Sequence, residues 1–357
     1  MFVPYYFGSR RVSGVDLPED RIVVLNRGGL VNRLKEVPFK IWGFSPHLSA
    51  SARRVNPALI HAHYGPNGVR VLPLAKALAK PLLVTFHGSD ANIQDHFANN
   101  LHYGHRKYIR QKHVLMREAR LFIAVSEFIR SKLIAQGFPS DRVITHYIGI
   151  DTELFRADLA VKRESVVLFV GRLIENKGGK YLIRAMSEVQ KEMPEVELVV
   201  IGDGPDRTEL IAEAKTRLRR YRFLGTQSHH VVRQWMNRAR VVAQPSVTLE
   251  SGASEGLPMV LCEALAMGTP IVSSHTAGIP ELVVDKESGL LVPERQWQAL
   301  AANIAMLLKH DALWDMFSTA GRKRVQTAFN LQRQCEKLDA IYQDVVAEQS
   351  ATAFQRV

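Results

Sequence analysis

The feature that most constrains the fold is a series of short β-branched runs, each followed by a Gly, Ser, Asn or Asp cluster and a helix-like segment. This alternation is typical of parallel βαβ units, because a parallel strand pair needs a long crossover that a helix usually supplies. Four runs lie in the first half, at residues 58–63, 81–86, 121–126 and 142–148, and four in the second, at residues 165–171, 196–202, 239–245 and 269–274. The two series predict an α/β protein with two doubly wound sheets.

The length of the chain agrees with two domains. Its 357 residues, 46% of them hydrophobic, exceed what one core usually organises, so each half can form a core of its own. The first series ends near Gly149, and a hinge is expected at residues 151–160. We expect a basic N-terminal domain, a C-terminal domain and a C-terminal helix that packs back towards the first domain, at residues 1–150, 151–330 and 331–357.

The net charge of +12 lies entirely in the first half of the chain. Residues 1–150 hold 21 Lys and Arg against 9 Asp and Glu, whereas residues 151–357 hold 26 of each class. Such asymmetry indicates a surface for anionic partners, either phospholipid headgroups or nucleic acid. Residues 106–120 are predicted to form an amphipathic helix that either lies on a membrane or turns an apolar stripe to the core. No nucleic-acid-binding module accompanies the charge, so we expect no nucleic-acid partner.

The cysteines and the lengths of the apolar stretches indicate in which cellular compartment the protein is expected. The two cysteines, Cys262 and Cys335, support neither a disulfide framework nor a Cys-rich metal site. No uninterrupted apolar stretch reaches the ~18 residues of a membrane span. The first basic residues follow the apolar ones, the reverse of a signal peptide. We therefore expect a cytoplasmic protein that is neither secreted nor inserted in a membrane.

Two cations follow the first run of the second series. In LFVGRLIENKGG the apolar strand is expected to end at Gly171, which places Arg172 and Lys177 where doubly wound sheets hold ligands. The Arg fork and the Lys point charge suit a diphosphate, and solvated loop cations are the alternative. Gly202 and Gly204 follow another strand in VVIGDGPD, and they are expected either to line a nucleotide or only to form a turn.

The segment SEGLPMVLCEALAMG is the most informative part of the chain. It predicts a helix opened by Pro258 that is apolar at nearly every position except Glu263. A carboxylate there needs solvent or a hydrogen-bonding partner, and a ribose diol is a suitable partner if the helix is buried. Glu255 lies just before the helix, whose free N–H groups, including those of Gly256 and Leu257, can hold phosphate or a sugar beside it.

Three histidines lie at or just beyond the ends of predicted strands in the first domain. His61 and His63 share a face of one strand whereas His87 belongs to another, and no Asp-x-Asp motif accompanies them, so we expect no metal site. His87, which precedes Gly88 and Asp90 in a loop, suits hydrogen bonds to sugar hydroxyls or to charge developing at an anomeric centre. A purely structural role is the alternative, and it is weaker for His87 than for His61.

With these residues placed, the sequence resembles the retaining glycosyltransferases of family 4, and in particular bacterial exopolysaccharide glycosyltransferases of the colanic-acid type. The resemblance runs from about residue 58 to residue 292. It is carried by IHAHYGPNG, VTFHGSD, FIAVSEFIRSKL, HYIGID, FVGRLIENKGG, VIGDGP, YRFLGT, SEGLPMVLCEALAMGTPIV and AGIPELV. It implies the GT-B fold, in which two Rossmann-like domains face each other across a cleft.

The resemblance also implies roles for individual residues. Those matching Arg172 and Lys177 hold the donor diphosphate, and the one matching Glu263 binds the ribose. Glu255 would face the donor sugar, which His87 approaches from the N-terminal domain. Further donor contacts are expected from Gly202, Leu224, Gly256, Leu257 and Pro258. The implied mechanism is metal-independent front-face substitution with retention, in which Glu255 stabilises charge and is not a nucleophile.

The expected reaction moves a hexose from a UDP- or GDP-sugar, with no other cofactor, to a glycan or polyprenyl-diphosphate-linked acceptor in surface polysaccharide synthesis. The basic half would contact anionic lipid at the inner face of the cytoplasmic membrane. Family members normally begin with a strand and a glycine-containing loop, whereas MFVPYYFGSRRVSG reads like entry at a later strand. The alternative is therefore a non-catalytic nucleotide-sugar-binding protein.

Overall fold

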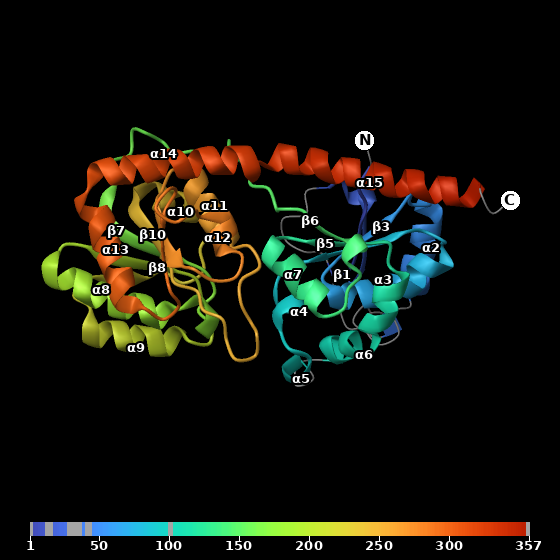
Figure 1. Cartoon of the computed structure of the whole chain (residues 1–357), viewed down its shortest axis with the longest axis horizontal. Helices are drawn as coiled ribbons and strands as arrows, with labels where there is room; N and C mark the ends of the chain where they lie inside the picture. The colour runs from blue at the N-terminus through green and yellow to red at the C-terminus, as the bar shows by residue number, and fades with distance from the viewer. Residues whose placement is uncertain (1–2, 11–16, 27–37, 40–44, 99–102, 355–357) are drawn as a thin grey trace. The chain divides into compact units, whose positions relative to one another are not determined.

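The chain forms two compact units, whose elements are labelled in Figure 1. The computed structural model describes residues 3–10, 17–26, 38–39, 45–98 and 103–354. Unit 1 comprises Met1–Val125, Arg130–His146 and Glu336–Val357, and unit 2 comprises Ser126–Ile129 and Tyr147–Cys335. Each unit therefore contains a segment from a distant part of the sequence.

Unit 2 is built on a six-stranded parallel sheet in the order β12-β11-β10-β7-β8-β9. Its strands are β7 (Glu164–Val170), β8 (Glu197–Ile201), β9 (Tyr221–Phe223), β10 (Ala239–Gln244), β11 (Ile271–Ser274) and β12 (Leu290–Val292). The strand order reverses between β7 and β10, which are hydrogen-bonded neighbours. Doubly wound sheets bind ligands at such a reversal, beyond the carboxyl ends of the strands.

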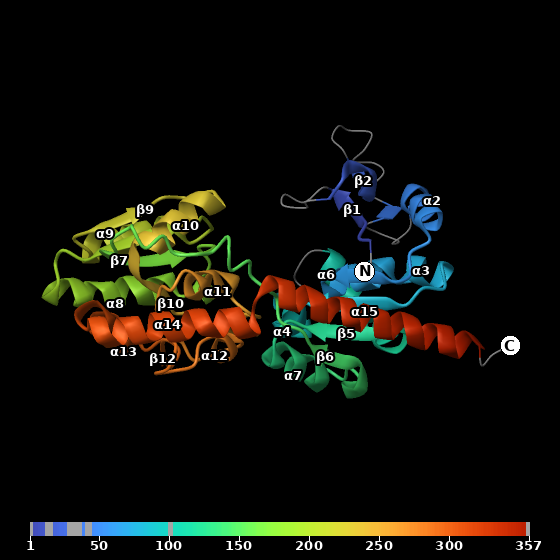
Figure 2. The ribbon, with the colours of Figure 1, turned by 90° about the horizontal axis from the view of Figure 1, so that it is seen from above.

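Helices complete the core of unit 2. Helices α8 (Gly179–Glu192) and α13 (Trp297–Lys309) lie side by side (Figure 2). Their residues Met186 and Ile304 are fully buried in one cluster with Phe169 of β7. The remaining helices are α9 (Arg207–Arg217), α10 (His229–Arg238), α11 (Met259–Ala266), α12 (Ile279–Leu282) and α14 (Asp311–Ala328).

Unit 1 contains a four-stranded parallel sheet in the order β3-β4-β5-β6 and a separate two-stranded parallel sheet, β1-β2. Its strands are β1 (Tyr6–Arg10), β2 (Ile22–Asn26), β3 (Ile60–His63), β4 (Leu82–Phe86), β5 (Leu121–Ala124) and β6 (Val143–Thr145). All eight predicted runs contain a strand, whereas β1, β2, β9 and β12 lie outside the two predicted series. The absence of a first strand and loop stays a prediction, and residues 1–2 and 11–16 lie outside the described residues.

The basic amphipathic segment forms α6 (Tyr103–Glu118), which packs against α3 (Gly65–Ala77). Its residues Tyr108 and Leu115 are 4% and 0% exposed. A Cβ atom at Gly68 would lie 2.9 Å from a methyl group of Val84 on β4 and 3.3 Å from Leu115, so glycine lets α3 approach the sheet and α6 closely. The apolar stripe therefore faces the core, which is the second of the two sequence alternatives. No helix among the described residues is long and apolar enough to cross a membrane.

The other helices of unit 1 include one that returns from unit 2. Helix α15 (Leu331–Phe354) begins in unit 2, and its residues from Glu336 onwards belong to unit 1. Val345 of α15 forms one hydrophobic cluster with Leu83 of β4 and Ile123 of β5. The remaining helices are α2 (Pro46–Val55), α4 (Ser89–Asn92), α5 (Asp95–Ala98) and α7 (Glu127–Ala135), whose first turn belongs to unit 2.

Candidate functional site

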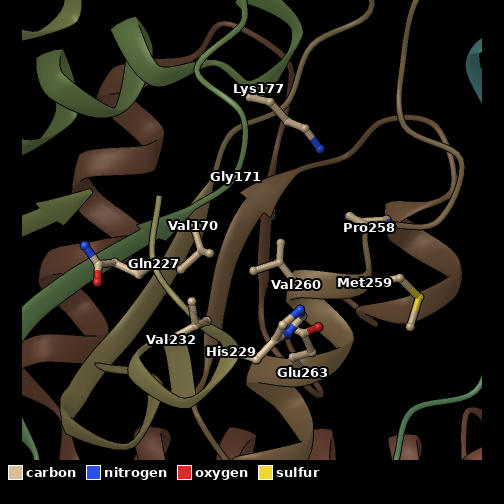
Figure 3. A pocket seen from close by; sticks show the side chains of 10 residues that line it. All are labelled: Val170, Gly171, Lys177, Gln227, His229, Val232, Pro258, Met259, Val260 and Glu263. Carbon is tan, nitrogen blue, oxygen red and sulfur yellow. The ribbon is translucent and has the colours of Figure 1, made fainter. Parts of the chain in front are cut away.

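A cavity of about 220 Å³ lies beyond the carboxyl end of β7, where the strand order of unit 2 reverses (Figure 3). It is lined by Val170, Gly171, Lys177, Gln227, His229, Val232, Pro258, Met259, Val260 and Glu263. Figure 3 shows Lys177 and Glu263 on opposite sides of the cavity. The sequence singled out both of these residues, and the structure brings them to one site.

Two loops meet across the reversal and give the site its shape. The Val247 amide donates to the Asn176 carbonyl at 2.9 Å, which joins the loop after β10 to the loop after β7. Gly178 has a φ of 71°, and a Cβ atom there would lie 1.8 Å from the carbonyl oxygen of Pro245. No side chain fits at that distance, so glycine is what allows the loops to touch. The contact between the loops places Lys177 next to Glu255, which lies in the segment that precedes α11.

The Glu255 carboxylate sits where these loops meet. Its Oε1 atom lies 2.7 Å from Nζ of Lys177, in an ion pair that neither residue's motif predicted. The same oxygen accepts a hydrogen bond from Gln244 Nε2 at 3.0 Å and another from Ser246 Oγ at 2.9 Å. Glu255 is only 8% exposed. Three donors therefore converge on one buried carboxylate oxygen.

Glu263 is the second carboxyl of the site. It lies on α11 between Cys262 and Ala264, which are both fully buried, and its own side chain is partly buried and faces the cavity. Burial raises its pKa to about 7. Within the described ranges its side chain accepts no hydrogen bond. A partly buried carboxyl without a partner suits a ligand that brings hydroxyl donors.

Of the predicted donor contacts, Lys177, Pro258 and Glu263 line the cavity, whereas Glu255, Gly256, Leu257, Arg172, Gly202 and Leu224 do not. Arg172 is exposed on the loop after β7. Gly202 has a φ of 136°, and a Cβ atom there would lie 1.8 Å from the carbonyl oxygen of Gly171, so its glycine serves the close approach of two strand ends. The Leu224 amide donates to Val200 at 2.9 Å. Contact of these residues with a nucleotide stays a prediction.

The backbone before α11 is held from two directions. The Ser126 hydroxyl donates to the carbonyl of Gly256 at 3.1 Å and also accepts the Ile129 amide at 3.2 Å, which caps α7. A Cβ atom at Gly278 would lie 1.9 Å from the same Gly256 carbonyl oxygen. Gly256 and Leu257 are both buried. The start of α11, with its free N–H groups, is therefore fixed beside Glu255.

Sequence reasoning missed several residues of this site, among them Gln227, His229, Val232, Gln244 and Ser246. The first three come from the start of α10 and the loop before it. The signal for the last two was present, because Gln244 lies near the end of the run at residues 239–245 and Ser246 directly follows it, just as Arg172 follows its own strand. Polar residues at the carboxyl ends of strands in doubly wound sheets often contact ligands, and this holds for β10 as well as for β7.

The three histidines form a stack in unit 1. Strands β3 and β4 are neighbours, with His63 opposite Thr85. The His63 ring therefore lies between His61 and His87, with ring centroids 4.6 Å and 5.2 Å away, and its Nδ1 is 3.0 Å from His87 Nε2. Their place on different strands therefore does not separate His63 from His87. No group of three or more His, Cys, Asp or Glu among the described residues has an arrangement that could hold a metal ion.

The imidazoles of this stack are held neutral. Desolvation lowers the pKa of His61 to about 3 and that of His63 to about 4, with a smaller contribution from neighbouring imidazolium charge. Burial also lowers the pKa of His87. The buried Asp90 carboxylate accepts the amides of His87 at 3.1 Å and Gly88 at 3.0 Å, and that of Gly65 at 2.9 Å. Asp90 therefore fixes the loop that carries His87.

Two family models match the chain. Glycosyltransferase Family 4 matches residues 9–154, and Glycosyl transferases group 1 matches residues 151–324. The first covers most of unit 1, and the second covers the strands and the cavity of unit 2.

Curated relatives match over most of the chain. WcaL of Salmonella typhimurium, assigned as a colanic acid biosynthesis glycosyltransferase, is 30% identical over 296 residues, which are 80% of this chain and 70% of WcaL. The amylovoran biosynthesis glycosyltransferase AmsK of Erwinia amylovora is 30% identical over 285 residues, which are 76% of this chain and 66% of AmsK. The chain thus spans about two thirds of the length of these relatives.

Solved structures share the fold. HepE of Anabaena, in complex with UDP and glucose, has a TM-score of 0.73 at 22% identity, covering 91% of this chain and 92% of HepE. Sucrose-phosphate synthase from Thermosynechococcus elongatus has a TM-score of 0.74 at 22% identity, covering 92% of this chain and 84% of the synthase. These likenesses confirm the predicted fold class.

Proposed function

Because this chain belongs to the group 1 glycosyltransferases of family 4, with the GT-B fold, we propose that it transfers a hexose from a UDP- or GDP-sugar to a glycan or lipid-linked glycan acceptor. The observation that carries the proposal is the cavity of unit 2, with Lys177 on one side and Glu263 on the other. WcaL and AmsK are named for exopolysaccharide synthesis, and HepE for complexes with UDP and UDP-glucose. Those names support the same process and the same class of donor here.

The donor diphosphate is assigned to the Lys177 side of the cavity. Lys177 lines it, Arg172 lies on the same loop, and the first turn of α11 begins after Pro258. Two cations and the free N–H groups of a helix N-terminus together stabilise a diphosphate. In this proposal they supply the positive charge that the leaving diphosphate needs, so the transfer is metal-independent.

The ribose is assigned to Glu263. Its pKa of about 7 leaves the carboxyl divided between its two forms at neutral pH when no ligand is bound. Two ribose hydroxyls that donate to the carboxylate favour its ionised form, so binding a nucleotide should lower this pKa. The partnerless carboxyl then becomes a specific contact for the nucleoside.

The transferred hexose is assigned to Glu255. Its Oε1 atom is engaged by three donors, which suits a fixed charge that orients the sugar better than it suits a nucleophile. We propose front-face substitution with retention, in which the leaving diphosphate accepts the proton of the attacking hydroxyl. His87 is proposed as a further hydrogen-bond donor to the sugar hydroxyls or to the developing charge.

Transfer assays on the Glu255→Ala and Lys177→Ala variants test the proposal. A panel of UDP- and GDP-sugars is first screened for thermal stabilisation of the whole protein, because a ligand that binds only the folded state raises its stability. Transfer or donor hydrolysis is then measured with each ligand that binds. We expect both variants to lose most activity, whereas Lys191→Ala, an exposed cation at the end of α8, should keep it. Unchanged activity in both variants would contradict the assignment, and binding without turnover would favour the non-catalytic alternative.

A further inference from the structure

The ion pair between Lys177 and Glu255 conflicts with the ligand proposed for Lys177. The two side chains are 2.7 Å apart and only 16% and 9% exposed. A Lys177 ammonium that turns to a diphosphate weakens or breaks this contact. Removing one partner from a buried ion pair is strongly destabilising, because the remaining charge stays out of water. Something else must therefore support Glu255 when the donor is bound.

Two fully buried residues, Gln244 and Ser246, are placed to give that support. The Gln244 amide donates both to Glu255 Oε1 at 3.0 Å and to Ser246 Oγ at 3.2 Å. Ser246 Oγ donates in turn to the same Oε1 atom at 2.9 Å, which closes a triangle of hydrogen bonds. Neither residue lines the cavity, so both act on the site through Glu255.

The backbone contacts and the side-chain hydrogen bonds of Gln244 both indicate that its NH₂ group is held in place as a hydrogen-bond donor to Glu255. Gln244 ends β10, and its carbonyl accepts the Ser273 hydroxyl of β11 at 2.6 Å, which ties it to the neighbouring strand. Its Oε1 atom is buried and has no hydrogen-bond partner among the described residues. An unpaired buried amide oxygen lowers the stability of a fold. This side chain is therefore poorly explained by folding alone, whereas its NH₂ group serves Glu255.

We propose that Gln244 and Ser246 are positioning residues that hold the Glu255 carboxylate in place while Lys177 turns to the donor diphosphate. The inference rests on the proposed function. With both residues present, Glu255 releases Lys177 readily. Without one of them, Glu255 holds Lys177 more tightly, and the ammonium is less available to phosphate. Affinity for a nucleoside diphosphate should therefore depend on Ser246, although Ser246 does not line the cavity.

A double-mutant cycle on nucleotide affinity tests this dependence. The probes are UDP and GDP, titrated into the full chain by calorimetry. We expect Ser246→Ala to weaken binding of the nucleotide that binds the unsubstituted protein by roughly tenfold, the scale of one hydrogen bond to a charged group. In a Lys177→Ala background the same change should have no further effect on affinity, because the ammonium for which Glu255 and the phosphate compete is gone. A direct contact between Ser246 and the ligand would give equal losses in both backgrounds.

Two further variants and one control complete the test. Ser246→Thr keeps the hydroxyl and should keep the affinity. Gln244→Glu replaces a donor with a second carboxyl. Its affinity, divided by that of the unsubstituted protein at the same pH, should therefore be low at about pH 8 and higher at about pH 5, where one carboxyl of the pair is protonated. Comparison at the same pH removes the effect of Glu263, whose pKa is about 7. Ser274→Ala is the matched control, because this serine is also fully buried and its hydroxyl has no partner among the described residues. It should bind nucleotide normally.

The outcomes separate this inference from the proposed function. The positioning role is overturned, and the donor site left intact, if folded Ser246→Ala binds nucleotide normally and Gln244→Glu shows the same pH dependence of binding as the unsubstituted protein. Equal losses in both Lys177 backgrounds overturn it as well. Failure of the unsubstituted protein to bind either UDP or GDP overturns the donor site and the inference together. If Ser246→Ala does not fold, Gln244→Glu decides through the difference between its pH dependence and that of the unsubstituted protein.

Discussion

The hydroxyl of Tyr342 lies 2.5 Å from Nδ1 of His61, although 281 residues separate the two in the sequence. The other ring nitrogen of His61, Nε2, lies 2.7 Å from the Thr85 hydroxyl. Both nitrogens are thus engaged while burial and the neighbouring histidines hold the pKa at about 3. A neutral imidazole therefore joins α15 to β3 and β4.

This imidazole should make the protein sensitive to acid. The unfolded chain takes up a proton at His61 near pH 6.5, and the folded chain does so only near pH 3. Between these values the unfolded state binds more protons, so the free energy of unfolding falls as the pH falls, by up to about 1.4 kcal/mol per pH unit for one such group. Urea unfolding over that range measures the slope. His61→Asn should flatten it and the exposed His47→Gln should not; an unchanged slope in His61→Asn would contradict the prediction.

Glu263→Gln should stabilise the ligand-free protein above neutral pH. The folded-state pKa of about 7 exceeds the ordinary value of 4.5, so ionisation of Glu263 lowers stability as the pH rises between them. We expect a gain of about 1–3 kcal/mol at about pH 8 and little change at about pH 4. The same substitution should weaken nucleotide binding. Thermal unfolding with and without UDP or GDP measures both effects, with the exposed Glu209→Gln as control.

Gly178→Ala should damage the donor site far more than Gly137→Ala. Both glycines have a positive φ, 71° and 90°. A Cβ atom at Gly137 meets nothing within 4 Å, so alanine there bears only the backbone strain of about 1 kcal/mol. At Gly178 it would meet the Pro245 carbonyl, and the loops must separate. We expect a larger loss of stability and of nucleotide affinity, measured by thermal unfolding and calorimetry. Equal effects at the two positions would show that the loop contact does not matter.

Arg172→Ala should weaken nucleoside diphosphate binding by about tenfold or more, because an Arg fork forms charge-assisted hydrogen bonds with phosphate. Arg172 is exposed, so the substitution should leave the free energy of unfolding nearly unchanged. Calorimetric titration and chemical unfolding of the same sample separate the two effects. Arg172→Lys should recover only part of the affinity, since lysine keeps the charge without the fork. Full affinity in Arg172→Ala would remove this residue from the donor site.

Unit 1, which carries most of the basic N-terminal half of the chain, should bind anionic lipid by electrostatic attraction alone, without apolar insertion. The apolar stripe of α6 is used in the core, with Leu115 fully buried, so no insertion by this helix is expected. Binding to anionic vesicles at low salt should therefore be lost at about 0.5 M salt, where charges are screened within a few ångströms. Replacing exposed Arg106 and Arg110 with alanine should weaken it. Neutral vesicles are the control, and salt-resistant binding would show an apolar contribution.

The strand pattern predicted the fold better than it predicted the edges of the sheets. The run at residues 165–171 became β7 because the five consecutive apolar residues 166–170, VVLFV, are mostly β-branched or aromatic and have no helical periodicity. Strand β12 has only three residues, Leu290–Val292, and is defined by pairing with β11. Such a short segment carries no pattern of its own. Its place depends on the neighbour that it pairs with.

The site residues were predicted where local sequence carries the signal. Glu263 stands out as the one carboxyl in an apolar helix, and Lys177 as a cation at a strand end. The pairing of Lys177 with Glu255 was not predicted, because it depends on two loops that meet only once β7 and β10 lie side by side. The histidine stack was missed for the same reason. Which strands pair with each other is set by the tertiary structure and cannot be read from the spacing of motifs in the sequence.

The last turns of α15 have a consequence for synthesis on the ribosome. Domains usually fold in the order in which they emerge, the N-terminal one first. Here unit 2 ends at Cys335, whereas unit 1 needs the residues after it, including Val345, to cover Leu83 and Ile123. Part of the sheet of the nascent first half therefore stays uncovered until α15 has emerged. The second half can complete its core earlier, so vectorial synthesis favours folding in the reverse of the usual order.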